Sequence, residues 1–297
     1  MIMRILDLFQ LLLLSALWGS SFLFIRVAVP VLGPIWLIQF QVLLAGLVFL
    51  PVLVQLGLLH QIRRNLIPLI VTGCINSAVP FSLFAFASLS LPAGFTSILN
   101  ATTPLFGIVI ASVFLQEKLT TTRMVGLILG FIGVVVFVGW KAISATSTFL
   151  LAVSAGLSAA LMYATAAPYA QKKFAGVSSL VVATGSQLSA AFLLLPILPF
   201  TIPQQIPSIT VVMAVIALAL LSNAFARVLY FQLIENIGST KTLTVNYLVP
   251  VFAMLWGALI LKETVTVSMI LGCSLILLGT AIANDLFTGV LTRESEN

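Results

Sequence analysis

Charged side chains are scarce in this sequence of 297 residues. Only 7% of the residues are Asp, Glu, Lys or Arg, whereas an ordinary soluble domain has roughly 25%. Hydrophobic residues make up 61%, which excludes a folded surface that mainly contacts water. The lipid bilayer is the expected solvent, and the chain is therefore expected to be an integral membrane protein.

Cysteine and histidine are rare as well. Cys74 and Cys273 lie in apolar stretches away from any CxxC motif or His/Cys cluster, so we interpret them as buried small hydrophobic residues. His60 lies in a connection, and no two acids share one face of an apolar stretch. A membrane-embedded enzyme would need a nucleophile with a base, a metal cluster or paired acids. The sequence therefore disfavours an enzyme, and we expect no cofactor and no metal site.

Apolar stretches of about twenty residues recur along the whole chain, and each can cross a hydrocarbon core of roughly 30 Å as a helix. Runs such as residues 11–14 and 134–138 lack the alternation of a barrel strand. We therefore predict an all-α integral membrane fold of about ten transmembrane helices, the first retained and not cleaved as a signal peptide. The predicted spans are residues 9–30, 35–57, 66–88, 93–115, 123–140, 148–170, 178–199, 207–233, 242–261 and 267–287.

The positions of Lys and Arg predict the orientation of the chain. If both termini are cytoplasmic, only Lys141 and Lys262 lie outside, as the positive-inside rule favours. The net charge of +6 comes without a basic patch interleaved with aromatic residues, so the bilayer is the expected partner and nucleic acid is not. We predict a multi-pass protein of the cell membrane whose cytoplasmic segments hold Arg4, Arg63, Arg64, Lys118, Arg123, Lys172, Lys173, Lys241 and Arg293.

The sequence contains an internal repeat, in which residues recur after a constant shift of 146 positions, for example from position 104 to position 250. Matches of asparagine, proline, glutamate and glycine in one ungapped register are not expected by chance in apolar sequence. The first set is Thr96, Asn100, Pro104, Phe106, Leu115, Glu117, Thr120, Gly126, Leu129 and Gly133. The second set is Thr242, Asn246, Pro250, Phe252, Leu261, Glu263, Thr266, Gly272, Leu275 and Gly279.

Each repeat holds five predicted helices, and because this number is odd, the second copy must enter the membrane from the opposite side. Residues 1–146 and 147–297 are therefore predicted to form two inverted five-helix repeats within one integrated membrane domain. Inverted halves give a protein two related conformations, each open to one side, with a substrate site near the midplane between them. This symmetry favours an alternating-access transporter.

Three motifs carry a resemblance to a known family. They are Trp18-Gly19-Ser20-Ser21-Phe22, Pro104 followed by Glu117-Lys118-Leu119-Thr120, and Pro250 followed by Glu263-Thr264-Val265. Together they resemble the EamA family of the drug/metabolite transporter superfamily, over essentially the whole chain. The resemblance implies a five-plus-five helix arrangement around a central cavity and, usually, export of amino acids and related metabolites. The sixth predicted helix departs from the family pattern, because it lacks the Trp often seen there and offers Tyr163.

Polar residues in mid-span are costly in lipid and tend to face the protein interior or a wet cavity. Asn223, Arg227 and Tyr230 follow one another at i, i+4 and i+7 and are predicted to share one helix face. Arg227 either snorkels to the cytoplasmic headgroups or recognises an anionic or carboxylate group in the cavity, whereas for Arg26 snorkelling is favoured. The other cavity candidates are Trp18, Ser21, Asn76, Asn100, Tyr163, Gln187, Asn246 and Tyr247.

Asn100 and Asn246 each precede a proline by four residues, and a proline frees the carbonyl at that distance. A capped kink and a direct contact with substrate are both open for these two residues. Glu117 and Glu263 end their helices beside short turns, where a carboxylate can bind the amides that open the next helix. We interpret this repeated pair of glutamates as structural.

Glycines recur in the fifth and tenth predicted helices and permit close helix approach. We favour packing of these two helices against each other over a homodimer interface, which stays an alternative. The glycines are Gly126, Gly130, Gly133, Gly272 and Gly279.

The whole sequence predicts an alternating-access transporter that exports or exchanges small polar metabolites such as amino acids. A passive channel or a membrane scaffold protein is the alternative, because both can be apolar and helical. All acidic residues lie in predicted tails, loops or outermost helical turns, the least remote being Asp285. Because proton-coupled carriers commonly hold a titratable group inside the membrane, we expect facilitated transport.

Overall fold

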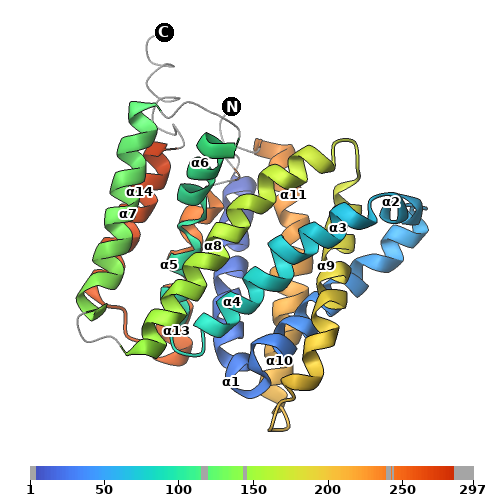
Figure 1. Ribbon diagram of the computed structural model, residues 1–297, viewed down its shortest axis with the longest axis horizontal. Helices are drawn as coiled ribbons and strands as arrows, with labels where there is room; N and C mark the ends of the chain where they lie inside the picture. The colour runs from blue at the N-terminus through green and yellow to red at the C-terminus, as the bar shows by residue number, and fades with distance from the viewer. Residues whose placement is uncertain (1–4, 115–119, 143–145, 239–241, 243, 284–297) are drawn as a thin grey trace.

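A computed structural model describes residues 5–114, 120–142, 146–238, 242 and 244–283, and most of these residues are helical. Among them, seven helical stretches are long and apolar enough to cross a membrane, and two shorter apolar helices accompany them. The all-α membrane class predicted from the sequence is thus confirmed. The helices run between two ends of the molecule, and α1 (Ile5–Gln55) begins at the end where α14 (Val267–Ala283) finishes (Figure 1).

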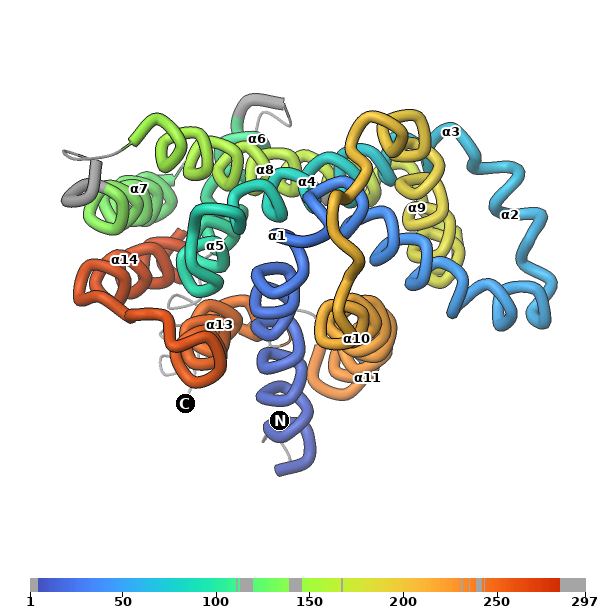
Figure 2. Tube along the Cα trace, turned by 90° about the horizontal axis from the view of Figure 1, so that it is seen from below, coloured from blue at the N-terminus to red at the C-terminus, as the bar shows by residue number. Residues whose placement is uncertain are grey.

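The first helix, α1, has 51 residues and therefore contains two of the predicted spans. Its backbone turns at Gly33, whose φ of 70° and ψ of 164° are not helical. Glycine suits this position because it has no Cβ to oppose a positive φ. The predicted break at residues 32–34 is confirmed, and the two arms of α1 point in different directions from this turn (Figure 2).

Short connections and local breaks divide the rest of the chain. In chain order the elements are α2 (Leu59–Arg64), α3 (Leu66–Gly73), η1 (Cys74–Ala78), α4 (Val79–Ala87), α5 (Ala93–Asn100), α6 (Thr103–Phe114), α7 (Thr121–Ala142), α8 (Ser147–Lys173), α9 (Ser179–Leu194), η2 (Leu195–Phe200), α10 (Ile209–Ala217), η3 (Leu218–Phe225), α11 (Ala226–Ile237), α13 (Val245–Leu261) and α14.

The sequence had predicted that Pro104 kinks a continuous helix, but the structure shows two separate helices at this point. α5 ends at Asn100 and α6 begins at Thr103. The break arises because the proline ring clashes with the carbonyl four residues earlier, and because proline has no backbone N–H to donate the helical hydrogen bond. That carbonyl, of Asn100, accepts the Thr103 hydroxyl at 2.7 Å instead. Pro250, by contrast, lies inside α13 as predicted.

Two π-helical segments lie at corresponding positions of the two sequence repeats. η1 covers Cys74–Ala78 and η3 covers Leu218–Phe225, and the repeat shift places the first segment within the second. π-helical turns are rare and frequently occur at functional sites. Each segment contains a predicted cavity residue, Asn76 in η1 and Asn223 in η3.

Helices α7 and α14 pack against each other along a seam of glycines. An ideal Cβ built on Gly126 would lie 2.6 Å from the carbonyl oxygen of Gly279, and one on Gly133 would lie 2.8 Å from the backbone nitrogen of Ile276. The two backbones therefore approach closely because no side chain separates them. This confirms the predicted packing of the fifth helix against the tenth, and both views show the pair at one edge of the molecule (Figures 1 and 2).

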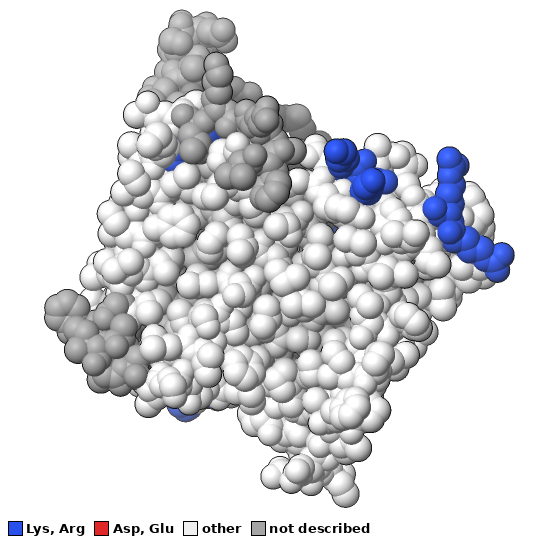
Figure 3. All heavy atoms as spheres, in the orientation of Figure 1, with Lys and Arg blue, Asp and Glu red and all other residues white. Residues whose placement is uncertain are grey.

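The lateral surface is largely apolar, as lipid requires. Large hydrophobic side chains such as Val135 and Phe192 are exposed on it. Figure 3 shows this face almost entirely uncharged, with Lys and Arg atoms gathered toward the end that carries α2. Arg64 in α2 and Lys172 and Lys173 at the end of α8 are exposed basic residues.

Candidate functional site

A cavity of about 260 Å³ lies between α8, α9 and α11. Its lining is mostly apolar and comes from the last turn of α8, the connection that follows, the first turns of α9, and α11. Arg227 is the charged residue in this lining. The lining residues are Ala170, Phe174, Val177, Ser179, Val182, Ala183 and Arg227.

Arg227 holds a charge without a counter-charge. Within the described residues its guanidinium makes no hydrogen bond and no ion pair, whereas Arg26 pairs with Glu263. Tyr163 on α8 lies within electrostatic reach of Arg227. A cation at the centre of a membrane helix costs roughly 2.5–3.5 kcal/mol on insertion scales, and the cost is smaller toward the end of the helices, where this cavity lies. An arginine in this setting needs water or an anion in the cavity beside it.

Aromatic side chains connect α1, α4, α8 and α11 and are not themselves among the lining residues of this cavity. The rings of Trp18 on α1 and Tyr230 on α11 lie 5.4 Å apart between centroids. Phe22, one turn after Trp18, contacts Phe84 on α4 at 6.2 Å, and Phe84 contacts Tyr163 on α8 at 5.8 Å. Apolar and aromatic walls with a few polar groups are typical of small-molecule sites.

Two amide side chains in this part of the molecule lack hydrogen-bond partners among the described residues. Gln187 on α9 is 2% exposed, and neither its Nε2 nor its Oε1 is paired. The Nδ2 of Asn223 is likewise buried and unpaired. Gln187 lies four residues after Ala183, and Asn223 four residues before Arg227, so both lie about one turn from the cavity lining. Because buried polar groups are normally hydrogen-bonded, water or a ligand is the expected partner of these two amides.

The predicted cavity residues do not all lie together. Ser21 and Asn76 are half-buried in α1 and η1, and Tyr247 is half-buried in the first turn of α13. Asn246 is exposed in that same turn. Asn100 ends α5, and its Oδ1 lies 3.5 Å from the Thr103 hydroxyl. Of the predicted residues, the structure places Arg227 in the lining of the cavity and Gln187 and Asn223 about one turn from that lining, whereas Trp18, Tyr163 and Tyr230 are not among its lining residues.

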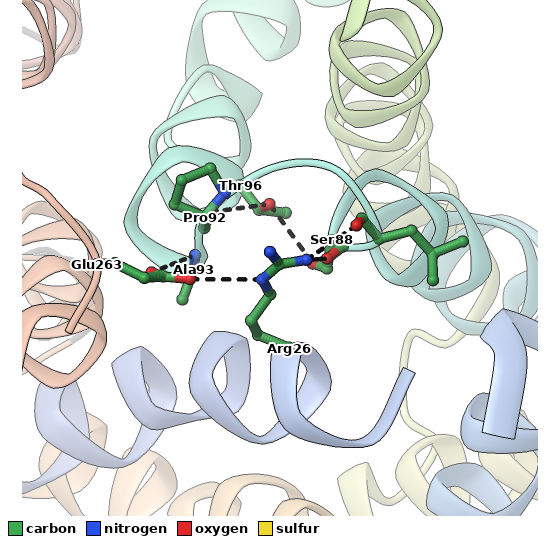
Figure 4. Close-up of polar contacts among 7 residues, drawn as sticks. Arg26, Ser88, Pro92, Ala93, Thr96 and Glu263 are labelled. Carbon is green, nitrogen blue, oxygen red and sulfur yellow. Dashed lines mark hydrogen bonds and ion pairs between the residues drawn. The ribbon is translucent and has the colours of Figure 1, made fainter. Parts of the chain in front are cut away.

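A second polar cluster lies where α4 leads into α5 (Figure 4). The Nε of Arg26 lies 3.4 Å from Oε1 of Glu263, and its Nη1 donates to the carbonyls of Ser88 and Leu89 at the end of α4. The prediction that Arg26 snorkels to the headgroups is therefore wrong, because protein groups satisfy its donors. Sequence reasoning missed this ion pair, although the opposite charges at the same predicted external end were a usable signal.

Glu263 also caps a helix. Its Oε2 accepts the backbone N–H of Ala93, the first residue of α5, at 2.9 Å. The sequence predicted that this glutamate binds backbone amides at the start of a helix, and this type of contact is confirmed. The capped helix, however, is α5 and not the next helix, α14. The repeat partner Glu117 lies outside the described residues.

Membrane-spanning helices that border a mostly apolar cavity with a charged side chain are compatible with a membrane transporter. Comparison with protein families places the chain within that class: it belongs to the EamA-like transporter family, whose model matches residues 6–139 and again residues 150–284. The resemblance drawn from the sequence motifs is thereby confirmed, and the protein is a multi-pass membrane transporter.

The chain is similar along almost its full length to several transporters. A Salmonella typhimurium protein named "Probable amino-acid metabolite efflux pump" is 26% identical, with 93% of this chain and 94% of that protein covered. An Escherichia coli protein of the same name is 24% identical, with 91% of this chain and 92% of that protein covered. An uncharacterized transporter of Archaeoglobus fulgidus is 23% identical over 89% and 94%. One crystal structure at 20% identity superposes with a TM-score of 0.66 over 99% of this chain and 100% of that one, which shows a shared fold.

Proposed function

We propose that this transporter exports or exchanges small metabolites that bear a carboxylate, such as amino acids, by alternating access. The observation that carries the proposal is the Arg227 guanidinium, which borders the cavity without an anionic partner among the described residues. A substrate carboxylate would supply that partner, and its geometry matches a guanidinium in a bidentate contact. The names of the two efflux-pump relatives support the same class of substrate.

The other groups around Arg227 suit the remainder of an amino acid. The unpaired Oε1 of Gln187 can accept a hydrogen bond from an ammonium group. Trp18 and Tyr230 offer flat apolar surfaces to a side chain. The volume of about 260 Å³ lies below the roughly 300–1,000 Å³ of pockets for drug-sized ligands. These features favour a small metabolite.

The proposed mechanism uses ten spans arranged as two inverted five-helix repeats, residues 1–146 and 147–297. Three observations support it: the sequence repeat, the family model that matches twice, and the corresponding π-helical segments. The cavity lining itself comes from the second half, and aromatic contacts join Trp18 and Phe84 of the first half to Tyr230 and Tyr163 of the second. A site between inverted halves can face either side of the membrane in turn.

The proposed orientation places both termini in the cytoplasm of the cell, with the transporter in its cell membrane. The exposed basic residues at the end that carries α2 support this, since cytoplasmic loops are enriched in Lys and Arg. The α4–α5 and α13–α14 turns then face the outside. Transport is proposed to be facilitated and to run down the gradient of the substrate.

Uptake into liposomes tests the role of Arg227. Purified protein is reconstituted, and entry of a radiolabelled mixture of L-amino acids is measured at concentrations below saturation. We expect Arg227→Met to reduce uptake about tenfold or more, because a charge-assisted hydrogen bond contributes roughly 1.5–3 kcal/mol. Arg64→Met, at an exposed arginine of α2, is the matched control and should transport normally. Equal uptake by both variants and the unmodified protein would contradict the proposal.

A further inference from the structure

The Arg26–Glu263 cluster joins the two halves of the chain at one end. Arg26, Ser88 and Ala93 come from α1 and the α4–α5 connection of the first half, and Glu263 comes from the α13–α14 turn of the second. Figure 4 shows the guanidinium between the Glu263 carboxylate and the end of α4. The cavity beside Arg227 is lined where α8 ends and α9 begins, toward the opposite end of the helices (Figure 1).

The turn after α13 positions Glu263 for this contact. Lys262 adopts a left-handed conformation with φ of 57°, and the N–H groups of Lys262 and Glu263 both donate to the carbonyl of Gly257, that of Glu263 at 3.1 Å. An ideal Cβ on Gly257 would lie 2.5 Å from Oε2 of Glu263, so glycine leaves room for the carboxylate. The carboxylate is thereby directed at the N-terminus of α5, whose partial positive charge favours it.

The exposure of the two charges is suited to a contact that forms and breaks. The Arg26 side chain is 29% exposed and that of Glu263 is 15% exposed. Fully exposed ion pairs contribute little to stability, whereas fully buried pairs are very costly to separate. This pair lies between the two limits, since water can reach both groups and solvate them once they separate.

We infer that Arg26 and Glu263 form a latch that closes the external end while the cavity opens toward the cytoplasm, and that separates when the cavity opens to the outside. This inference rests on the proposed transport function and its orientation. An inverted-repeat transporter moves one group of helices against the other around a fixed site. Contacts that bridge the halves at one end must part when that end opens. The Arg26–Glu263 latch therefore sets the ratio of the two conformations.

The accessibility of a cysteine beside the latch provides the test. Thr96 is fully buried, and its hydroxyl lies 3.4 Å from that of Ser88. In cells that express Thr96→Cys with Cys74→Ala, the rate of modification by a membrane-impermeant maleimide is measured from outside. We expect Glu263→Gln and Arg26→Gln each to raise this rate about fivefold or more.

Two controls separate opening of the latch from other effects. Lys262→Gln removes an exposed charge from the same turn and should leave the rate unchanged. The native Cys273, buried in the seam of α7 and α14, should react no faster in any variant unless the whole fold loosens. If Thr96→Cys lowers the amount of folded protein, Ser97→Cys, also fully buried, replaces it.

The outcome is decided by the comparison of rates. Faster labelling at residue 96 or 97 in Glu263→Gln and Arg26→Gln, with Cys273 and Lys262→Gln unaffected, supports the latch. Equal rates in all variants, or a parallel rise at Cys273, would overturn it. The labelling requires no substrate, so the latch can fail while the role of Arg227 in transport stands, and the reverse can also be observed.

Discussion

The two arginines in the membrane-spanning helices should respond in opposite ways to loss of their charge. Arg26 is held by Glu263 and by the carbonyls of Ser88 and Leu89. Arg227 has no such partner among the described residues. Methionine is the substitution of choice in both cases, because it keeps a long, flexible apolar side chain and removes the charge.

The expected magnitudes follow from these contacts. Arg26→Met leaves the Glu263 carboxylate without its counter-charge, which costs roughly 3–5 kcal/mol in a fully buried pair. Because Glu263 is 15% exposed, solvent screening reduces this, and we expect a loss of about 1–3 kcal/mol, or a Tm lower by roughly 2–10 °C. Arg227→Met removes an unpaired cation and should leave the Tm unchanged or raise it.

Thermal unfolding in detergent, followed by tryptophan fluorescence with and without L-amino acids, measures both effects. The amino acid that binds should raise the Tm of Arg26→Met. It should not raise that of Arg227→Met, whose affinity we expect to fall about 10- to 150-fold. A fall in Tm for Arg227→Met as large as that for Arg26→Met would refute the reasoning, since it would show that Arg227 is held by structural partners.

Three further outcomes are expected. Gly279→Ala should lower the Tm, because it overpacks the seam of α7 and α14 at a cost of about 1–3 kcal/mol. Gly107→Ala should not lower the Tm, because an ideal Cβ on Gly107 would meet nothing within 4 Å. Equal effects of the two substitutions would contradict the close packing at the seam. In reconstituted protein, Gln187→Met should weaken competition by L-leucine on the order of tenfold but leave that by its 2-oxo acid unchanged, and equal loss for both would show that Gln187 does not bind the ammonium group. Reporters fused after α6 and after α13 should appear on opposite sides of the membrane, and reporters on the same side would exclude inverted repeats.

Local chemistry made much of the fold predictable. Hydrophobic length gives the spans, Gly33 marks the turn in α1, and the glycines of α7 and α14 indicate close packing. The π-helical segments η1 and η3 were not predictable, because nothing in their residue types separates them from α-helix. The break before Pro104 was predicted as a kink, since proline chemistry alone does not decide between the two.

The candidate site was predictable in part, for a physical reason. Most helices are apolar on all sides, so periodicity does not reveal which face is wet, and only the cost of burying polar groups singles out Arg227, Asn223 and Gln187. Contacts between residues far apart in the chain, such as Arg26 with Glu263, need the three-dimensional arrangement. Favouring snorkelling for Arg26 was reasonable from one helix alone and wrong once its neighbours were present.

Counterflow in liposomes tests the central claim most directly. Proteoliposomes preloaded with a high concentration of the unlabelled amino acid are diluted into a trace of the same labelled compound, with no pH gradient and no membrane potential. An alternating-access carrier should concentrate the label transiently above its external level, at a rate that saturates with substrate. Label that only equilibrates, without stimulation by the preload and without saturation, would show a passive channel and contradict the account.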